Sequence, residues 1–240
     1  MTLLILIFND VFGDQDSFIV FSLLFFILMT LVTVRWLFRE TKLILGLKKE
    51  KKQAELLHLK SQVNPHFFFN TLNNLYGLVE KDVEQAQQLI LKLSEMMRYS
   101  IYEGQNDWVA LGEEIEFLQR YIEIHQMRYH KTIVVKFDLD VSDSSVKVMP
   151  LLFIILLENA FKHGVENLRK NPFVHLHLRA SRDHIDFEIE NNFDPDETTK
   201  NKGIGLKNLR RRLQLVYPDR HQLTTQSKAH LFKVKLSLYL

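Results

Sequence analysis

A histidine at position 66 lies in the segment QVNPHFFFN (62–70), between side-chain amides and directly after a proline. Pro65 lacks a backbone N–H donor and clashes with the preceding turn, so we expect a bend or local loss of helix near Asn64. The imidazole of His66 is a nitrogen nucleophile whose ordinary pKa of about 6.5 leaves much of it neutral near pH 7. It could therefore accept a phosphoryl group. A helix-capping histidine beside a proline kink is the alternative.

A second polar cluster, ENAFKHG (158–164), ends the apolar run from Leu151 to Leu157. Its carboxylate, amide and ammonium groups are what Mg-ATP requires, namely oxygen ligands for the ion and cations for the phosphates. The end of a helix also favours Lys, His and a left-handed Gly, so capping explains the last three residues equally well. Capping does not explain Glu158 and Asn159, which stand among apolar neighbours.

A third segment, GIGLKNL (203–209), follows a polar loop and precedes three consecutive arginines, 210–212. Glycines at the start of a helix let backbone amides approach phosphates closely, and the helix dipole adds attraction. The spacing is neither that of a P-loop nor a complete dinucleotide fingerprint. A loop-to-helix turn with an exposed basic face is therefore an equally open interpretation.

The elements around these segments are first helical. Apolar residues recur at helical spacing from Leu43 to about Glu80, then from Ala86 to Met97 and from Ile115 to Ile122. Two such helices joined by a short turn form an antiparallel hairpin, and its apolar stripe needs a partner. We therefore expect a homodimer that pairs two hairpins in a four-helix arrangement.

After Lys131 the apolar period changes to two, which indicates a strand and a new domain. The following pattern predicts a buried helix, two strands around a turn, a further helix and a terminal hairpin. Their expected ranges are 149–165, 174–191, 206–216 and 222–240. This order predicts an α+β fold in which an α/β sandwich carries helices on one face of a largely antiparallel sheet.

The amino-terminal region is apolar and uncharged from Ser17 to Val34, long enough as a helix, at roughly 27 Å, to nearly cross a bilayer core. Acidic residues precede this stretch, and basic residues follow it from Arg35 to Lys52. The positive-inside rule then puts the rest of the chain in the cytoplasm. We expect one membrane span at about 17–38, and a buried core helix is the alternative.

Composition excludes several classes of function. The chain has 31 Lys and Arg against 29 Asp and Glu, a formal charge of +2, so it lacks the basic excess of a nucleic-acid binder. We expect no direct contact with nucleic acid. Since there is no cysteine, disulfides, thiolate metal sites and cysteine nucleophiles are excluded.

Taken in this order, the three segments resemble the LytS/YehU-type sensor histidine kinases over roughly residues 45–240. Residues 62–70 look like the phosphoacceptor signature of that family, 158–164 like its asparagine motif and 203–213 like its glycine-rich motif. The resemblance implies the ATP-binding GHKL (Bergerat) fold shared by gyrase, Hsp90, histidine kinases and MutL, with ATP and Mg²⁺ as cofactors.

The resemblance also implies residue roles. His66 would be the phosphoacceptor, Glu158 would activate or orient, and Asn159 would ligate Mg²⁺. Asn70, one helical turn after His66, could orient a water for dephosphorylating the partner. The other expected nucleotide contacts are Lys162, His163, Asn191, Gly203, Gly205 and Leu206.

One departure from the family pattern concerns adenine. Where many relatives have an aspartate that receives the adenine amino group, this chain has Asn191, which accepts without charge assistance. A degenerate, catalytically weak kinase that acts as a dimeric, membrane-bound docking or regulatory protein is therefore the alternative function.

The expected organisation has three parts: a membrane anchor (1–40), a helical dimerisation and phosphoacceptor region (41–130) and an ATP-binding catalytic domain (131–240). The leading function is autophosphorylation of His66 from ATP and phosphoryl transfer to an aspartate of a response regulator. The resemblance implies that this regulator joins a receiver domain to a LytTR-type DNA-binding output.

Overall fold

The computed structural model describes residues 15–61, 65–128, 133–165, 168, 171–195 and 204–240. The chain divides into two compact units, with the division between Ala54 and Glu55. This division does not test the expected boundary at 130/131, which lies within 129–132, outside the described residues.

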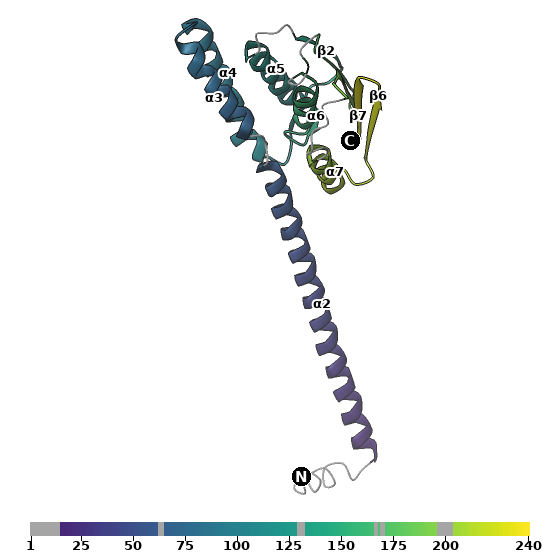
Figure 1. Ribbon diagram of the computed structural model, residues 1–240. Coiled ribbons are helices and arrows are strands. Elements are labelled where there is room, and N and C mark those ends of the chain that lie inside the picture. Colours follow the sequence, from purple (N-terminus) through teal and green to yellow (C-terminus); the bar gives the residue numbers. More distant parts are fainter. Residues whose placement is uncertain (1–14, 62–64, 129–132, 166–167, 169–170, 196–203) are drawn as a thin grey trace. The chain divides into compact units, whose positions relative to one another are not determined.

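Helix α2 (Gln15–Ser61), the long helix of Figure 1, makes up the described part of the first unit and continues into the second. Within the described residues, it alone is long and apolar enough to cross a membrane. The hydroxyls of Thr30 and Thr41 donate to carbonyl oxygens one turn earlier, at 2.7 Å each, so these polar groups are satisfied within the helix. The apolar helix expected at about 17–38 is confirmed, and its crossing of a membrane stays a prediction.

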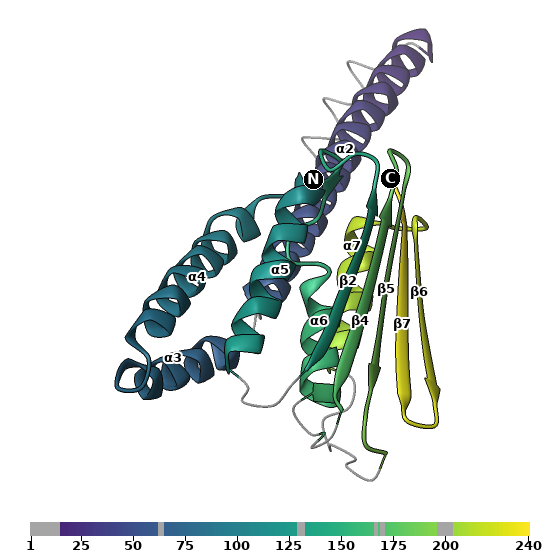
Figure 2. The same cartoon turned by 90° about the horizontal axis from the view of Figure 1, so that it is seen from above.

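The second unit begins with a helical hairpin, α3 (Pro65–Val79) and α4 (Val83–Ile101), shown in Figure 2. Pro65 stands at the first helical position, where its missing N–H costs nothing. Asp82 caps α4 by accepting a hydrogen bond from the Gln85 amide at 2.9 Å. Helix α2 ends at Ser61, and the break expected near Asn64 lies outside the described residues.

The helical region continues through a short turn, η1 (Glu103–Gln105), to α5 (Leu111–Arg128). A small two-stranded sheet joins β1 (Val109–Ala110), just before α5, to β3 (Lys147–Val148).

A five-stranded sheet in the order β2-β4-β5-β7-β6 forms the other half of the unit. Only β2 and β4 pair in parallel, and the other neighbours are antiparallel. The strand bounds are β2 Val134–Val141, β4 Phe173–Ala180, β5 His184–Asn192, β6 His221–Lys228 and β7 Leu231–Tyr239. Alternate side chains of β4 and β5 are buried, as the period of two requires.

Helices α5, α6 (Ile154–Ala160) and α7 (Ile204–Val216) lie on one face of this sheet (Figure 2). A π-helical turn, η2 (Phe161–Val165), continues α6. The expected α+β fold, with helices on one face of a largely antiparallel sheet, is confirmed.

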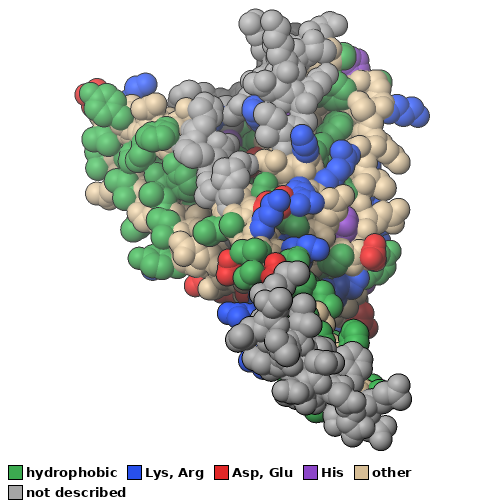
Figure 3. All heavy atoms as spheres, turned by 90° about the horizontal axis from the view of Figure 1, so that it is seen from below, with side chains coloured by type: hydrophobic (Ala, Val, Ile, Leu, Met, Phe, Trp, Pro, Cys, Tyr) green, Lys and Arg blue, Asp and Glu red, His purple; other side chains and the backbone are tan. Residues whose placement is uncertain are grey.

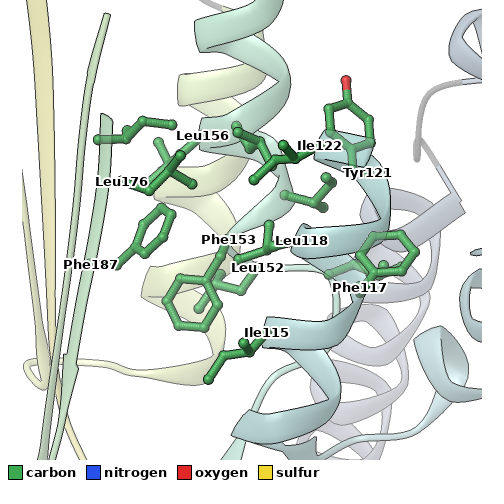
Figure 4. Packing of buried hydrophobic residues seen from close by; sticks show 14 of the residues in the cluster. Ile115, Phe117, Leu118, Tyr121, Ile122, Leu152, Phe153, Leu156, Leu176 and Phe187 are labelled. Atoms are coloured by element: carbon green, nitrogen blue, oxygen red, sulfur yellow. The ribbon is translucent and has the colours of Figure 1, made fainter. Parts of the chain in front are cut away.

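Helix α5 packs on two sides (Figure 4). One row, Ile115, Leu118 and Ile122, faces α6 and the sheet, whereas Phe117 lies on the opposite side of α5. The Phe117 ring stacks on Tyr99 of α4 at 4.7 Å between centroids. Helix α5 therefore joins the hairpin to the sheet domain through one continuous core.

The helix expected at 149–165 begins later than predicted. Leu151 has a φ of 55°, in the left-handed region, and regular helix starts only at Ile154. The apolar pattern from residue 149 onward predicts a continuous helix, because residue types alone do not reveal the left-handed conformation that tertiary contacts hold at Leu151.

Candidate functional site

His66 is the second residue of α3, and its side chain lies outside the described part of the structure. The next residue, Phe67, is 4% exposed and is anchored on α5. Its ring stacks on Tyr121, with centroids 4.6 Å apart, and on His125 at 5.2 Å. The backbone that carries His66 is thus adjacent to a well-packed contact with α5.

The same two α5 side chains contact Phe161, which begins η2 two residues after Asn159. The rings of His125 and Phe161 are 4.3 Å apart, and Tyr121 meets Phe161 edge-on at 5.7 Å. We call Phe67, Tyr121, His125 and Phe161 the aromatic cluster. It packs the segment after His66 and the segment after Asn159 against one patch of α5.

Sequence reasoning did not select Tyr121 or His125. Their spacing of four, on one helical face, was the available signal. Burial and, to a smaller extent, the charge of Arg128 lower the pKa of His125 to about 3, so the imidazole is neutral near pH 7. A neutral ring can stack in the aromatic cluster without the cost of burying a charge.

Glu158 lies in the last turn of α6 and is half-buried. Burial raises the pKa of its carboxyl to about 7, against the opposing influence of Lys162 and Arg212. Both protonation states are then populated near neutral pH, which suits a group that exchanges a proton during a reaction.

Asn159 and Gly205 are brought together. The Asn159 side-chain amide donates from Nδ2 to the Ile155 carbonyl at 2.7 Å, so Oδ1 is the atom suited to a cation. A Cβ on Gly205 would lie 3.1 Å from both amide atoms, so glycine lets the first turn of α7 approach Asn159 closely.

The Asn159 oxygen fits a cation that is shared with a ligand. Among the described residues, no group of three or more His, Asp or Glu side chains could hold a metal by itself. Mg²⁺ commonly binds through one or two protein oxygens together with substrate phosphates. The donor set around Asn159 therefore suits Mg²⁺ that arrives with a nucleotide.

Gly164 is required by close packing against β5. A Cβ there would lie 2.6 Å from Asn191 Nδ2 and 2.6 Å from the Asn192 carbonyl oxygen. Its backbone is not in the left-handed region, so the capping explanation for this glycine is wrong. Asn191, buried on β5, donates from Nδ2 to the Asn192 carbonyl at 3.0 Å, and so lies beside the end of the asparagine motif.

The other expected site residues that the structure describes lie on three elements, α3, η2 and α7. Asn70 is half-buried on α3, Lys162 is exposed and His163 half-buried on η2, and Leu206 packs partly against the core from α7. Gly203 lies outside the described residues.

The basic face expected on α7 is incomplete. Arg210 is exposed and Arg211 forms an ion pair with Glu55, with Nη2 and Oε2 2.8 Å apart. Arg212 is 1% exposed, so the interpretation of all three as a solvated face is wrong. Arg212 follows the buried Leu209 by three residues and precedes the buried Leu213, so its side chain lies on the buried side of the helix.

The hairpin carries exposed apolar side chains, some of which appear at the left of Figure 3. A stripe at helical spacing follows α3 and continues on α4: Phe69, Leu72, Tyr76, Val79, Val83, Ile90, Met97 and Ile101. We call these eight residues the hairpin stripe. The five-stranded sheet also has a polar hollow, on the face that the helices do not cover, and none of the predicted site residues lines it.

Comparison with known proteins follows the same segments. Residues 54–133, from the end of α2 through α5, match the histidine kinase family model. The sensor protein LytS of Enterococcus faecalis is 32% identical over 179 residues, which are 69% of this chain and 30% of that protein. LytS of Staphylococcus haemolyticus is 30% identical over 189 residues, covering 73% of this chain and 32% of that protein.

The sensor histidine kinase BtsS of Escherichia coli K12 is 31% identical over 170 residues, which are 70% of this chain and 30% of BtsS. The chain thus spans about a third of the length of these curated relatives.

Among solved structures, the catalytic domain of histidine kinase ThkA aligns with a TM-score of 0.40 at 13% identity, covering 55% of this chain and 93% of that domain. The histidine kinase domain of a blue-light activated kinase from Erythrobacter litoralis aligns with a TM-score of 0.41 at 16% identity, covering 80% and 94%. By sequence, this chain therefore belongs to the LytS-type sensor histidine kinases, the family that the three motifs predicted.

Proposed function

We propose that this chain is the kinase part of a two-component sensor, which phosphorylates its own His66 from ATP and passes the phosphoryl group to an aspartate of a response regulator. A ring nitrogen of His66 bonds to the γ-phosphorus as the bond to the β-phosphate oxygen breaks, and ADP leaves. Glu158, with a pKa of about 7, is the candidate group to activate or orient the imidazole.

One observation carries the proposal. Phe67 directly follows His66, Phe161 follows Asn159 by two residues, and both rings pack on Tyr121 and His125 of α5. A phosphoacceptor segment and a nucleotide-binding segment in one packed unit are what positioning catalysis of phosphoryl transfer needs.

The nucleotide would be held by residues around α6 and the start of α7. Asn159 would supply an oxygen to Mg²⁺, which neutralises charge on the phosphates when bound. The other proposed contacts are Lys162, His163, Asn191, Gly203, Gly205 and Leu206.

The hairpin stripe supports a homodimer. Tyr76 is 82% exposed and Phe69 66% exposed, and the stripe repeats at the spacing of a helix-packing face. A second copy of this chain would cover it in a four-helix bundle.

The membrane and partner assignments extend this proposal. Helix α2 would anchor the chain, and the basic residues from Arg35 to Lys52 would hold the kinase part on the cytoplasmic side. The phosphorylated partner would be a receiver-domain protein with a LytTR-type DNA-binding output, so this chain itself would not touch DNA.

Labelling tests the proposal. The full chain in lipid nanodiscs, incubated with Mg²⁺ and γ-labelled ATP, should acquire acid-labile, alkali-stable label that disappears in His66→Gln. His230→Gln, an exposed histidine in the turn between β6 and β7, is the matched control and should keep the label. Label that persists in His66→Gln would remove this function. Transfer is tested by adding a receiver-domain protein from the same organism, whose phosphoaspartate is alkali-labile.

A weak kinase that regulates a partner by docking is the second candidate, and Asn191 favours it. Its side chain is buried and donates to the neighbouring carbonyl, and it lacks the charge that would strengthen a bond to the adenine amino group. If the wild-type chain forms dimers yet neither binds ATP nor acquires label, this second function replaces the first.

A further inference from the structure

The segment that leads into α6 has no regular secondary structure and is held by side chains from other helices. The Met149 amide donates to the Tyr217 hydroxyl at 2.9 Å. The Leu151 amide donates to Glu114 Oε1 at 2.7 Å, and the Leu152 amide donates to Glu114 Oε2 at 3.2 Å. Helix α6 has no side-chain cap of its own, so its lead-in depends on these distant groups.

Arg212 holds the same peptide from the opposite side. This fully buried side chain of α7 donates from Nη1 to the Leu151 carbonyl at 2.8 Å. Its Nε and Nη2 have no hydrogen-bond partner within the described part of the chain. Burial lowers the pKa of Arg212 to about 10, and the charges of Glu114 and Glu158 oppose this shift, so Arg212 is electrostatically coupled to both acidic side chains.

Leu151 therefore has both its backbone polar groups bound by buried ionisable side chains. Its φ of 55° is uncommon for a residue other than glycine and needs surrounding contacts to persist. We call Glu114, Leu151 and Arg212 the Leu151 clamp. Because Ile154 starts α6 three residues later, the clamp sets where Glu158 and Asn159 lie.

The hairpin reaches the Leu151 clamp through Tyr99. This α4 residue donates from its hydroxyl to Glu114 Oε1 at 2.8 Å, in the buried core. The turn after α4 also touches the clamp, since a Cβ on Gly104 would lie 2.7 Å from Leu151 Cδ1. A shift of α4 would therefore change both a buried hydrogen bond and a packing contact.

We propose that Glu114 and Tyr99 are positioning residues for the nucleotide site. Glu114 and Arg212 hold the Leu151 peptide, three residues before the start of α6. Because Tyr99 of α4 donates a hydrogen bond to Glu114, the position of α4 affects how Glu114 holds this peptide. The inference rests on the proposed function for its purpose, since nucleotide affinity would then follow the state of the phosphoacceptor hairpin.

Two variants test the clamp with little change in volume. Tyr99→Phe removes only the hydroxyl and keeps the stack on Phe117, and Glu114→Gln replaces one acceptor oxygen by a donor. Tyr102→Phe and Glu116→Gln are matched controls, because both side chains are exposed, Tyr102 at the C-cap of α4 and Glu116 on α5.

Binding of a non-hydrolysable ATP analogue with Mg²⁺ is measured on the full chain in nanodiscs. Removing one partner of a buried hydrogen bond corresponds to roughly a tenfold change in an equilibrium constant. We expect the dissociation constant to rise about tenfold or more in Glu114→Gln and about three- to tenfold in Tyr99→Phe. For labelling by ATP, Tyr99→Phe should raise KM and leave kcat within about twofold.

Amide hydrogen exchange gives a second readout that needs no nucleotide. Exchange at Leu151 and Leu152 should accelerate in both variants, while exchange in β4 and β5 stays at the wild-type rate. The inference is overturned if either variant keeps wild-type exchange at these amides and wild-type analogue affinity. If Glu114→Gln does not fold, Tyr99→Phe decides alone.

The outcomes separate this inference from the proposed function. A wild-type chain that binds the analogue but never labels His66 would refute autophosphorylation and leave the clamp standing. If the wild-type chain labels His66, but Tyr99→Phe leaves the analogue affinity and the amide exchange unchanged, autophosphorylation stands and the role of the Leu151 clamp is refuted.

Discussion

Replacing Phe67 by alanine should release the phosphoacceptor helix from α5. The ring is 4% exposed and packs against the rings of Tyr121, His125 and Phe68, so the substitution removes these ring contacts and opens a cavity in the aromatic cluster. Buried Phe→Ala changes cost about 3–5 kcal/mol, of which each aromatic pair accounts for about 0.5–1.5 kcal/mol. Since α3 can partly collapse onto α5, we expect about 3–4 kcal/mol.

Urea unfolding of the full chain in nanodiscs, followed through Trp108, measures this loss. Trp108 packs edge-on against Tyr217, with centroids 5.8 Å apart, and so reports on the folded sheet domain. With a denaturant slope of about 2 kcal/mol per molar urea, the midpoint should fall by roughly 1.5–2 M. The rate of His66 labelling should fall at least about tenfold, because a phosphoacceptor that is no longer positioned reacts slowly.

Tyr102→Ala is the control, since this ring at the end of α4 is 68% exposed. Its unfolding midpoint should move by less than about 0.5 M, which corresponds to an exposed truncation. If Phe67→Ala shifts the midpoint no further than Tyr102→Ala, the aromatic cluster does not hold α3, and the argument from packing is refuted.

Three further predictions concern glycine packing and pH. Gly164→Ala should lower the free energy of unfolding by about 1–3 kcal/mol, because the new Cβ would lie 2.6 Å from the Asn192 carbonyl oxygen. Gly77→Ala is the control, since a Cβ on this exposed helical residue would have nothing within 4 Å, and it should raise the free energy of unfolding by about 0.5–1 kcal/mol. Thermal unfolding measures both changes. If ionised Glu158 assists the reaction, the labelling rate should rise with pH through about 7, and a Glu158→Gln variant that keeps this rise would contradict the role. His125 has a folded-state pKa near 3, below its unfolded value of 6.5, so its contribution is complete above pH 6.5 and is lost as pH falls toward 3. Between pH 7.5 and 5 the wild-type chain should therefore lose about 2 kcal/mol more than His125→Phe in urea unfolding, and equal losses would exclude burial of a neutral imidazole.

The site was only partly visible in the sequence. The three motifs identified Glu158, Asn159 and Gly205, which the structure brings to the same end of α6 and the start of α7. The roles of these residues stay predictions until the experiments above are done. Glu114 and Arg212 were missed because charged residues are usually exposed, and a single sequence does not indicate which of them find buried partners.

The spacing of apolar residues by itself predicted the amino-terminal helix, the helical hairpin and the strands, because helix and strand periodicity depends on residues a few positions apart. Pro65 likewise indicated a helix boundary, and α3 begins there. Tertiary structure alone decided that α5 packs on both the hairpin and the sheet, that Leu151 adopts a left-handed conformation, and that Gly164 admits no side chain. The physical reason is that these features depend on contacts between segments distant in sequence, whose burial and hydrogen bonding no local pattern encodes.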